Sequence, residues 1–159
     1  MKKILNPFVE FENYDCFGCS PNNIVGLKMQ FYEDNDEIIS EWEPDINYQG
    51  WNSILHGGIQ CTLIDEIASW YIFVKLKTFG VTSHLDIRLK KPVNISLGKI
   101  SLRAKLHLMK KNIAFIDVKL FDGEKNLCAE GIIQYFTYPK DKKIGEIYYP
   151  GYEKFVENN

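Results

Sequence analysis

HGGIQCTLIDEIASWYIFVK, residues 56–75, is the stretch that decides the fold. Its apolar side chains recur at the three- and four-residue spacing of one helix face. The pattern predicts a single long helix from about Gly58 to Lys77, with Gly80 just past its end as a stop signal. The glycine pair at the start leaves backbone N–H groups free at the positive end of the helix, where they can polarise a bound carbonyl oxygen.

The segments that flank this helix alternate apolar and polar residues, which is typical of half-buried strands. The alternation is clearest in ISLRAKLHLM, residues 100–109. Asp34-Asn35 and Asp122-Gly123 are turn signals between neighbouring runs. The sequence therefore predicts an α+β fold, in which an antiparallel sheet is wrapped around one long central helix, with strands at residues 26–33, 36–43, 81–91, 100–109, 113–121 and 127–138.

The composition is that of one globular domain spanning residues 1–159. Hydrophobic residues make up 45% and charged residues 25%, which argues against disorder. The formal net charge of -2 gives no general attraction to nucleic acid or to a membrane, so neither is an expected partner. No run approaches the ~20 apolar residues that span a bilayer. Pro7 and Glu10 interrupt the N-terminal segment before a signal-peptide core can form, and we expect a cytoplasmic protein.

The HGG run followed by Asp65, the order of the predicted elements, and the V-T-x-x-L-x-I-x-x-x-x-P pattern of residues 81–92 occur together in this chain. In these features it resembles the hotdog-fold acyl-CoA thioesterases, in particular the branch named after phenylacetate degradation. The resemblance covers the core, residues 16–137, with extensions on both sides. It implies a hotdog fold, cleavage of an acyl-CoA, and a homodimer that places the glycine end of one helix opposite the acid of the other.

Helix geometry also leads to a dimer. Gly57 and Asp65 are eight residues apart, so they lie roughly 12 Å apart along one helix at ~1.5 Å per residue. A carbonyl held at the glycine amides would therefore be out of reach of Asp65 on the same helix. The attacking acid must come from a second chain, which gives two equivalent composite sites in a dimer or in a tetramer built from dimers.

Asp65 is the predicted catalytic acid, because it falls on the flank of the apolar face, whereas the adjacent Glu66 points away and is the fallback. Asp65 would act as a general base toward water or as a direct nucleophile, and both roles stay open. Gly58 is the predicted main N–H donor to the carbonyl, and Gly57 permits its close approach.

The resemblance adds further candidates to the catalytic set. It implies that Thr82 orients water beside the acid, with Ser83 as the alternative, and that His56 holds the loop rather than acting as the base. The water-positioning carboxamide of the family lies six residues before the histidine, where this chain has Gly50. Asn47, Gln49 and Asn52 lie nearby, and which of these carboxamides takes that role stays open.

Two further groups of residues have ligand-binding chemistry. Arg88, Lys90 and Lys91 form a basic group that suits the phosphates of coenzyme A, although a solvated strand end explains it equally well. Cys16 and Cys19 have the C-x-x-C spacing of half a zinc site, but no second pair follows them. We therefore predict that the cysteines pack in the core and that the protein uses no metal or redox cofactor.

The leading hypothesis is hydrolysis of the thioester of a small or aryl acyl-CoA, with coenzyme A entering as part of the substrate. The alternative is a hotdog module that binds or senses acyl thioesters without cleaving them. A hotdog dehydratase is disfavoured, because His56 and Asp65 are too far apart on one helix to act together.

Overall fold

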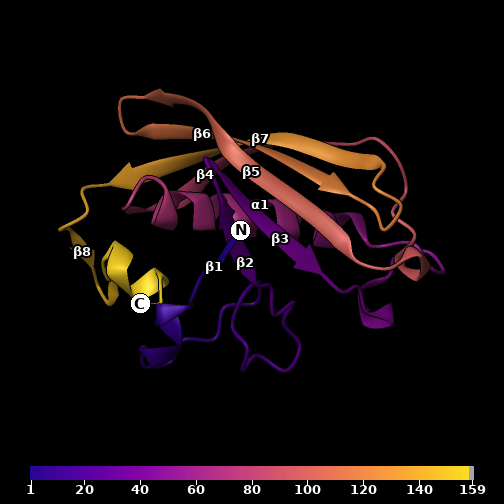
Figure 1. The fold of residues 1–159 in the computed structure, drawn as a ribbon, viewed down its shortest axis with the longest axis horizontal. Coiled ribbons are helices and arrows are strands. Elements are labelled where there is room, and N and C mark those ends of the chain that lie inside the picture. Colours follow the sequence, from indigo (N-terminus) through magenta and orange to yellow (C-terminus); the bar gives the residue numbers. More distant parts are fainter. Residues whose placement is uncertain (158–159) are drawn as a thin grey trace.

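The computed structural model describes residues 1–157. A seven-stranded antiparallel sheet curves around one long helix, as Figure 1 shows. The strand order is β1-β2-β3-β5-β6-β7-β4, which makes β4 an edge strand. The main elements are β1 (Lys2–Lys3), β2 (Phe31–Asp34), β3 (Glu37–Trp42), α1 (Gly57–Val74), β4 (Phe79–Leu89), β5 (Ile100–Lys110), β6 (Ile113–Phe121) and β7 (Leu127–Tyr138).

Helix α1 forms the centre of the core because its apolar residues share a face that the sheet covers. The side chains of Leu63, Ile64 and Ile67 are completely buried. Each contributes about 1.5–3 kcal/mol relative to leaving it exposed. The helix ends at Val74, three residues before the predicted end at Lys77, which adopts a left-handed φ of 53°.

Gly80 is part of β4, so the prediction that it stops the helix is wrong. A Cβ at Gly80 would come 2.5 Å from the carbonyl oxygen of Phe136 on β7. Real Cβ atoms do not approach a carbonyl so closely, and only glycine lets the two strands come together here. The glycine therefore serves the packing of the sheet edge rather than the end of the helix.

Strands β6 and β7 and the first half of β5 confirm the alternation that the sequence shows. Leu106 and Leu108, which the alternation places on the buried face of β5, are instead 36% and 49% exposed, where the pairing of β5 with β6 shifts register. Ile100, Leu102 and Ala104 of β5 are fully buried, while Arg103 and Lys105 between and beyond them are exposed. The buried residues point toward α1, as the predicted two-residue period requires. β6 and β7 begin and end at the predicted residues.

The strand predicted for residues 26–33 is shorter in the structure, because only Phe31–Asp34 pairs as β2. The residues before it form an irregular segment in which Lys28 has a left-handed φ of 53°. Backbone hydrogen bonds from Leu27 to Phe17 (2.8 Å) and from Met29 to Gly18 (3.0 Å) hold it against an earlier part of the chain. Contacts with that earlier segment therefore replace the expected sheet pairing.

The loop between β6 and β7 is organised by a buried aspartate. The Asp122 carboxylate accepts hydrogen bonds from the backbone N–H groups of Glu124 (3.0 Å) and Asn126 (2.9 Å). Burial raises the pKa of Asp122, but the hydrogen bonds from Asn126 and Glu124 outweigh it, so the net pKa is lowered. The turn predicted at Asp122-Gly123 is therefore present between β6 and β7, and the Asp122 carboxylate accepts the hydrogen bonds that hold it.

The chain termini cover the side of α1 that the sheet leaves open, below the helix in Figure 1. The ring of Phe8 lies 6.2 Å from that of Trp70 on α1 and 5.8 Å from that of Phe155. These aromatic contacts join both ends of the chain to the central helix. The remaining short elements are η1 (Pro7–Glu10), η2 (Ile46–Tyr48), η3 (Ile95–Leu97), β8 (Lys143–Ile144), β9 (Ile147–Tyr148) and η4 (Tyr152–Phe155).

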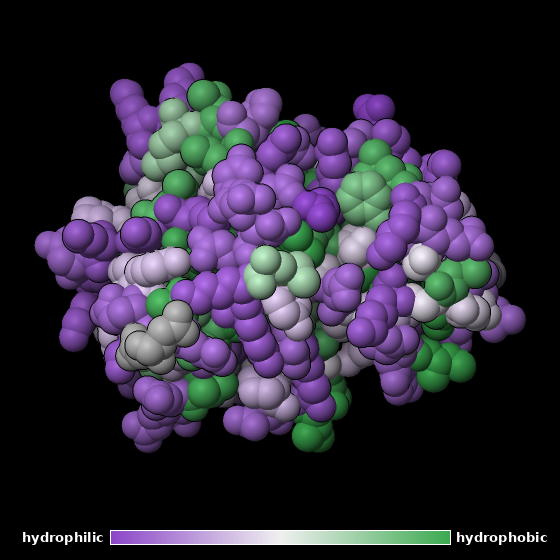
Figure 2. Space-filling model, in the orientation of Figure 1, coloured by the Kyte–Doolittle hydropathy of each residue, from purple (hydrophilic) through white to green (hydrophobic). Residues whose placement is uncertain are grey.

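The face of the molecule in Figure 2 is mainly hydrophilic, and its apolar side chains gather in separate small groups. None of the helices within residues 1–157 combines the length and the apolar character that crossing a membrane requires.

Candidate active site

The N-terminus of α1 is capped by a histidine. Nδ1 of His56 accepts a hydrogen bond of 2.9 Å from the backbone N–H of Gly58. The ring of His56 therefore caps the start of the helix. The same contact occupies the Gly58 N–H, which was the predicted carbonyl donor. The N–H of Gly57 has no hydrogen-bond partner within residues 1–157, so Gly57 presents the free donor.

Asp65 lies two turns further along α1, next to the open edge of the sheet. Oδ1 of its carboxylate accepts hydrogen bonds from Oγ1 of Thr82 (2.9 Å) and from the phenol of Tyr135 (2.7 Å). The two hydroxyls approach the same oxygen because Thr82 on β4 and Tyr135 on β7 are direct cross-strand partners. Oδ2 has no hydrogen bond within the described chain and is the oxygen available to a ligand.

Tyr135 is the residue of this site that sequence reasoning missed. Its side chain is 3% exposed, and the phenol is also 2.9 Å from the backbone carbonyl oxygen of Asp65. Burial and the neighbouring Asp65 charge raise the pKa of Tyr135 well above its ordinary value. The phenol therefore stays protonated and keeps donating. The sequence gives little indication of this role, because the alternation of β7 places Tyr135 on the inner face of the strand among ordinary core residues.

The other predicted catalytic residues lie apart from the Asp65 carboxylate. The hydroxyl of Ser83 donates a hydrogen bond of 3.1 Å to the backbone carbonyl of Gln134 on β7, so it points to the neighbouring strand and not to Asp65. Asn52 lies on the exposed loop before α1 and makes no side-chain hydrogen bond in the described part of the chain. Thr82 is thus the hydroxyl that the structure brings to Asp65.

Glu66 is held on another side of α1, away from the Thr82 and Tyr135 hydroxyls. Its Oε1 accepts a hydrogen bond of 3.1 Å from Nε1 of Trp70, and its carboxylate contacts the thiol of Cys16. Burial and the nearby Cys16 sulfur raise the pKa of Glu66 to about 7. The structure therefore places the fallback acid in a separate cluster with the C-x-x-C segment.

The basic group lies at the far end of β4 from Thr82. Arg88, Lys90 and Lys91 are exposed, and Nζ of Lys90 is 3.0 Å from the carboxylate of Glu130 on β7. The hydrogen bond from Lys90 lowers the pKa of Glu130. Leu89, within this group, touches the start of α1: its Cδ1 is 3.1 Å from the position of a Cβ at Gly57. The cations and the glycine end of the helix are therefore neighbours.

The comparisons with known proteins agree with this fold. The model of the thioesterase superfamily matches residues 52–129. That span contains the glycine pair, Asp65, Thr82 and the basic group, whereas the C-x-x-C segment and Tyr135 lie outside it.

Solved structures of thioesterases share the architecture. A thioesterase from Haemophilus influenzae superposes with a TM-score of 0.67 at 20% identity, covering 78% of this chain and 87% of that one. A hypothetical thioesterase from Streptococcus pneumoniae, determined with coenzyme A, gives a TM-score of 0.63 at 16% identity over 69% and 85% of the two chains. The sheet wrapped around one central helix is therefore the hotdog fold, as predicted.

A curated relative is a predicted esterase of Saccharolobus solfataricus, which is 30% identical over 87 residues. The match covers 54% of this chain and 56% of the relative, so it spans little more than half the length of that protein.

Proposed function

We propose that this protein is an acyl-CoA thioesterase whose active sites are shared between the two chains of a homodimer. The amides at the start of α1 in one chain polarise the thioester carbonyl, and Asp65 of the other chain activates water or attacks the carbonyl directly. The observation that carries the proposal is the placement of Asp65. Two hydroxyls fix one carboxylate oxygen and leave the other free at an unpaired sheet edge.

The hydroxyls keep Asp65 ready for this chemistry. Thr82 and the protonated phenol of Tyr135 hold the carboxylate in one orientation. Oδ2 is therefore already placed to contact a water molecule or a carbonyl carbon when the substrate binds. Both are positioning residues, because they act on the substrate through Asp65.

The edge strand β4 supports the dimer. Val81, Leu85 and Leu89 are apolar residues of β4 that are 46%, 44% and 48% exposed. An unpaired edge with exposed apolar side chains favours pairing with another strand. The occupant we infer is β4 of a second copy, since a self-complementary strand gives the closed two-fold arrangement that is commonest among homo-oligomers.

Antiparallel pairing of the two β4 strands would assemble the composite site. With the two-fold axis between Leu85 and Asp86, Leu89 of one chain lies opposite Thr82 of the other. Leu89 contacts Gly57 in its own chain, and Thr82 contacts Asp65 in its own chain. The pairing therefore brings the free N–H of Gly57 toward the carboxylate of the other subunit, which one chain alone does not achieve.

The same end of β4 suits the nucleotide part of coenzyme A. Arg88 and Lys91 are exposed beside the start of α1, and no salt bridge within residues 1–157 involves them. Guanidinium and ammonium groups bind phosphates by charge-assisted hydrogen bonds. The coenzyme A in the pneumococcal relative is consistent with this ligand class.

The His56 ring must move away from the Gly58 N–H if both glycine amides are to donate hydrogen bonds to the substrate carbonyl. Its Nδ1 occupies the Gly58 N–H in the present structure, whereas the N–H of Gly57 is free. We propose that the Gly57 amide receives the carbonyl oxygen first, and that a turn of the exposed His56 ring releases Gly58 as a second donor.

Thiol release from a panel of short, medium and aryl acyl-CoAs tests the proposal. The wild-type protein and Asp141→Asn, a matched change at an exposed aspartate of the C-terminal segment, should turn over at the same rate. Asp65→Asn should lose nearly all activity while it keeps its dimer and its melting temperature. Hydrolysis by Asp65→Asn at the wild-type rate would exclude the mechanism. Tight acyl-CoA binding with no hydrolysis by any form would instead identify a non-catalytic acyl-thioester binding module.

A further inference from the structure

We propose that Cys16, Cys19 and Glu66 form a binding site for a thiophilic divalent cation, with zinc as the ion of choice. The two thiol sulfurs and a carboxylate oxygen of Glu66 all lie within 4.8 Å of one another. Cys16 and Cys19 are both free thiols. The site joins the N-terminal segment to α1 and is separate from the Asp65 carboxylate and its two hydroxyls.

The spacing of the side chains matches tetrahedral coordination. Zinc binds sulfur at about 2.3 Å and carboxylate oxygen at about 2.0–2.2 Å, so two ligands at a tetrahedral angle are about 3.5–3.7 Å apart. The Cys16 sulfur lies 3.7 Å from Oε1 and 3.6 Å from Oε2 of Glu66. A hydrogen bond to sulfur is weak at such a separation, but an ion between the two groups would bind both at normal distances.

The loop that carries the cysteines is held in place by contacts outside the C-x-x-C segment. The hydroxyl of Tyr14 lies 2.8 Å from the sulfur of Cys19. Backbone bonds from Leu27 to Phe17 and from Met29 to Gly18 fix the loop independently of the thiols. The positions of the two sulfurs are therefore set before any ion arrives.

Gly18 is the residue that admits the third ligand. A Cβ at this position would lie 2.4 Å from Oε2 of Glu66. Any other residue at position 18 would displace the carboxylate, because this contact is far shorter than real Cβ contacts. The C-x-x-C segment thus carries an opening for Glu66 that packing of the cysteines alone does not require.

The cluster also lacks a positive charge. Glu66 is partly buried, and within residues 1–157 it has no salt-bridge partner. Its conventional hydrogen-bond donor is the neutral indole of Trp70. A buried carboxylate beside two thiols is costly without a compensating charge. A divalent cation would supply that charge and would bind all three groups at once.

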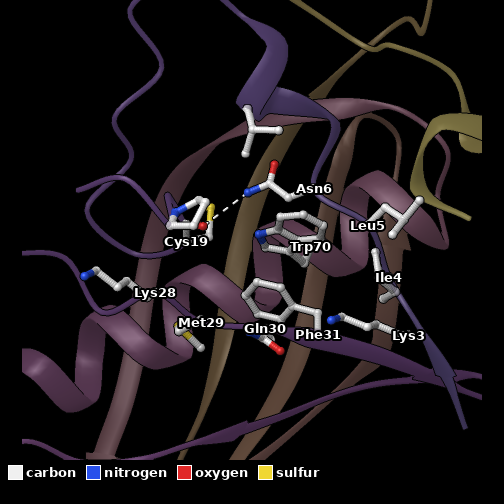
Figure 3. Close-up of a pocket in the computed structure, with 12 residues that line it drawn as sticks. Lys3, Ile4, Leu5, Asn6, Cys19, Lys28, Met29, Gln30, Phe31 and Trp70 are labelled. Carbon is white, nitrogen blue, oxygen red and sulfur yellow. Dashed lines mark hydrogen bonds between the residues drawn. The ribbon is translucent and has the colours of Figure 1, made fainter. Parts of the chain in front are cut away.

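Three protein ligands leave the fourth tetrahedral position to a water molecule. A cavity of about 430 Å³ adjoins the cluster through Cys19, between the N-terminal segment, β2 and α1. Figure 3 shows Cys19, Asn6, Trp70 and Phe31 among the residues that line this cavity. The side-chain N–H of Asn6 donates to the Cys19 carbonyl at 3.2 Å, which closes the wall next to the cysteine. The cavity gives solvent a route to the ion.

Metal content of untagged protein tests the site directly. Apo protein is loaded with zinc under reducing conditions, dialysed, and assayed by elemental mass spectrometry alongside three variants. They are the double variant Cys16→Ser with Cys19→Ser, the nearly isosteric Glu66→Gln, and the control Cys61→Ser, which removes a thiol of α1 outside the cluster. Cobalt substitution adds a second readout, because tetrahedral thiolate coordination gives intense visible bands.

We expect about one zinc ion per chain in the wild-type protein and in Cys61→Ser, and none in the double cysteine variant. Glu66→Gln should bind zinc about a hundredfold more weakly, since loss of a group that merely orients a ligand already costs ten- to a hundredfold. Zinc should raise the melting temperature of the wild-type protein and of Cys61→Ser only.

Several results would overturn the site. They are no zinc bound by the reduced wild-type protein, equal zinc binding by all the variants, or a Cys16–Cys19 disulfide in protein kept under reducing conditions. Because the readout is metal content, the outcome is independent of whether Asp65→Asn loses hydrolysis.

Discussion

Removing the hydroxyl of Tyr135 tests how Asp65 is held. Tyr135→Phe deletes one oxygen and keeps the buried ring, so the packing of β7 against α1 is preserved. The lost hydrogen bond is 2.7 Å long and ends on a carboxylate. Hydrogen bonds to charged groups contribute about 1.5–3 kcal/mol. If Asp65 needs that bond in the transition state, kcat should fall about tenfold to a hundredfold, since about 1.4 kcal/mol corresponds to a factor of ten.

The assay separates catalysis from binding and from folding. Steady-state thiol release should show a lower kcat with a nearly unchanged KM, because Tyr135 is buried and does not reach the substrate. The free energy of unfolding should fall by the same amount, about 1.5–3 kcal/mol, which lowers the melting temperature by about 3–12 °C in a domain of this size. Most molecules would therefore remain folded during the assay.

Tyr149→Phe is the matched control. The Tyr149 hydroxyl is buried and has no hydrogen-bond partner within the described chain. Its removal should leave kcat unchanged and the stability equal or higher, because an unsatisfied buried hydroxyl carries a desolvation cost. A wild-type kcat in Tyr135→Phe, or an equal loss in both variants, would show that the Tyr135 phenol does not position Asp65.

Three further perturbations address the dimer, the helix start and the β6–β7 loop. Leu85→Arg should be a monomer by light scattering and inactive in the thiol-release assay, because it puts a charge at the centre of the inferred β4 pairing. Ile24→Arg, on an exposed loop, should stay an active dimer. Gly58→Ala places a Cβ 3.0 Å from Nδ1 of His56 and should lower kcat without unfolding the protein; unchanged kinetics would argue against a role for this helix start. Asp122→Ala should cost about 2 kcal/mol in urea denaturation at pH 7. The lowered pKa of Asp122 means that its stabilisation is fully present above the unfolded-state pKa and is lost as the pH falls through the folded-state pKa. The difference between the two proteins should therefore shrink in acid, and a constant difference would contradict this.

The fold was predictable because its strongest signals are local. Helical spacing in α1 and the two-residue period in the first half of β5 each report a buried face directly. The errors arose where a distant contact decided the structure. Gly80 reads as a helix stop, but the carbonyl of Phe136 on β7 is what requires a glycine there. The segment before β2 reads as strand, but backbone bonds to Phe17 and Gly18 hold it in another conformation.

The site was predictable only in part, for the same reason. Asp65 stands in a short motif, and Thr82 matches a pattern soon after it in the sequence. Tyr135 is 70 residues from Asp65, and its alternation is that of an ordinary core residue. Glu66 is 50 residues from Cys16. Sequence rules for metal sites describe ligands within one short segment, so they do not predict that these two residues are neighbours. Helical phase distinguished Asp65 from Glu66 but did not identify what Glu66 faces.

The pairing of β4 with β7 has a consequence for folding. β4 ends at Leu89 and its neighbour begins at Leu127, so the chain must close a long loop before Thr82 and Tyr135 stand opposite each other. Sheets dominated by such non-local pairings fold in milliseconds to seconds, and more slowly than helical bundles. A chain emerging from the ribosome would therefore expose α1 with Asp65 well before the two hydroxyls that orient it are in place. The carboxylate that we propose as catalytic and the edge that we infer to bind a second subunit would both be completed last, when β7 docks.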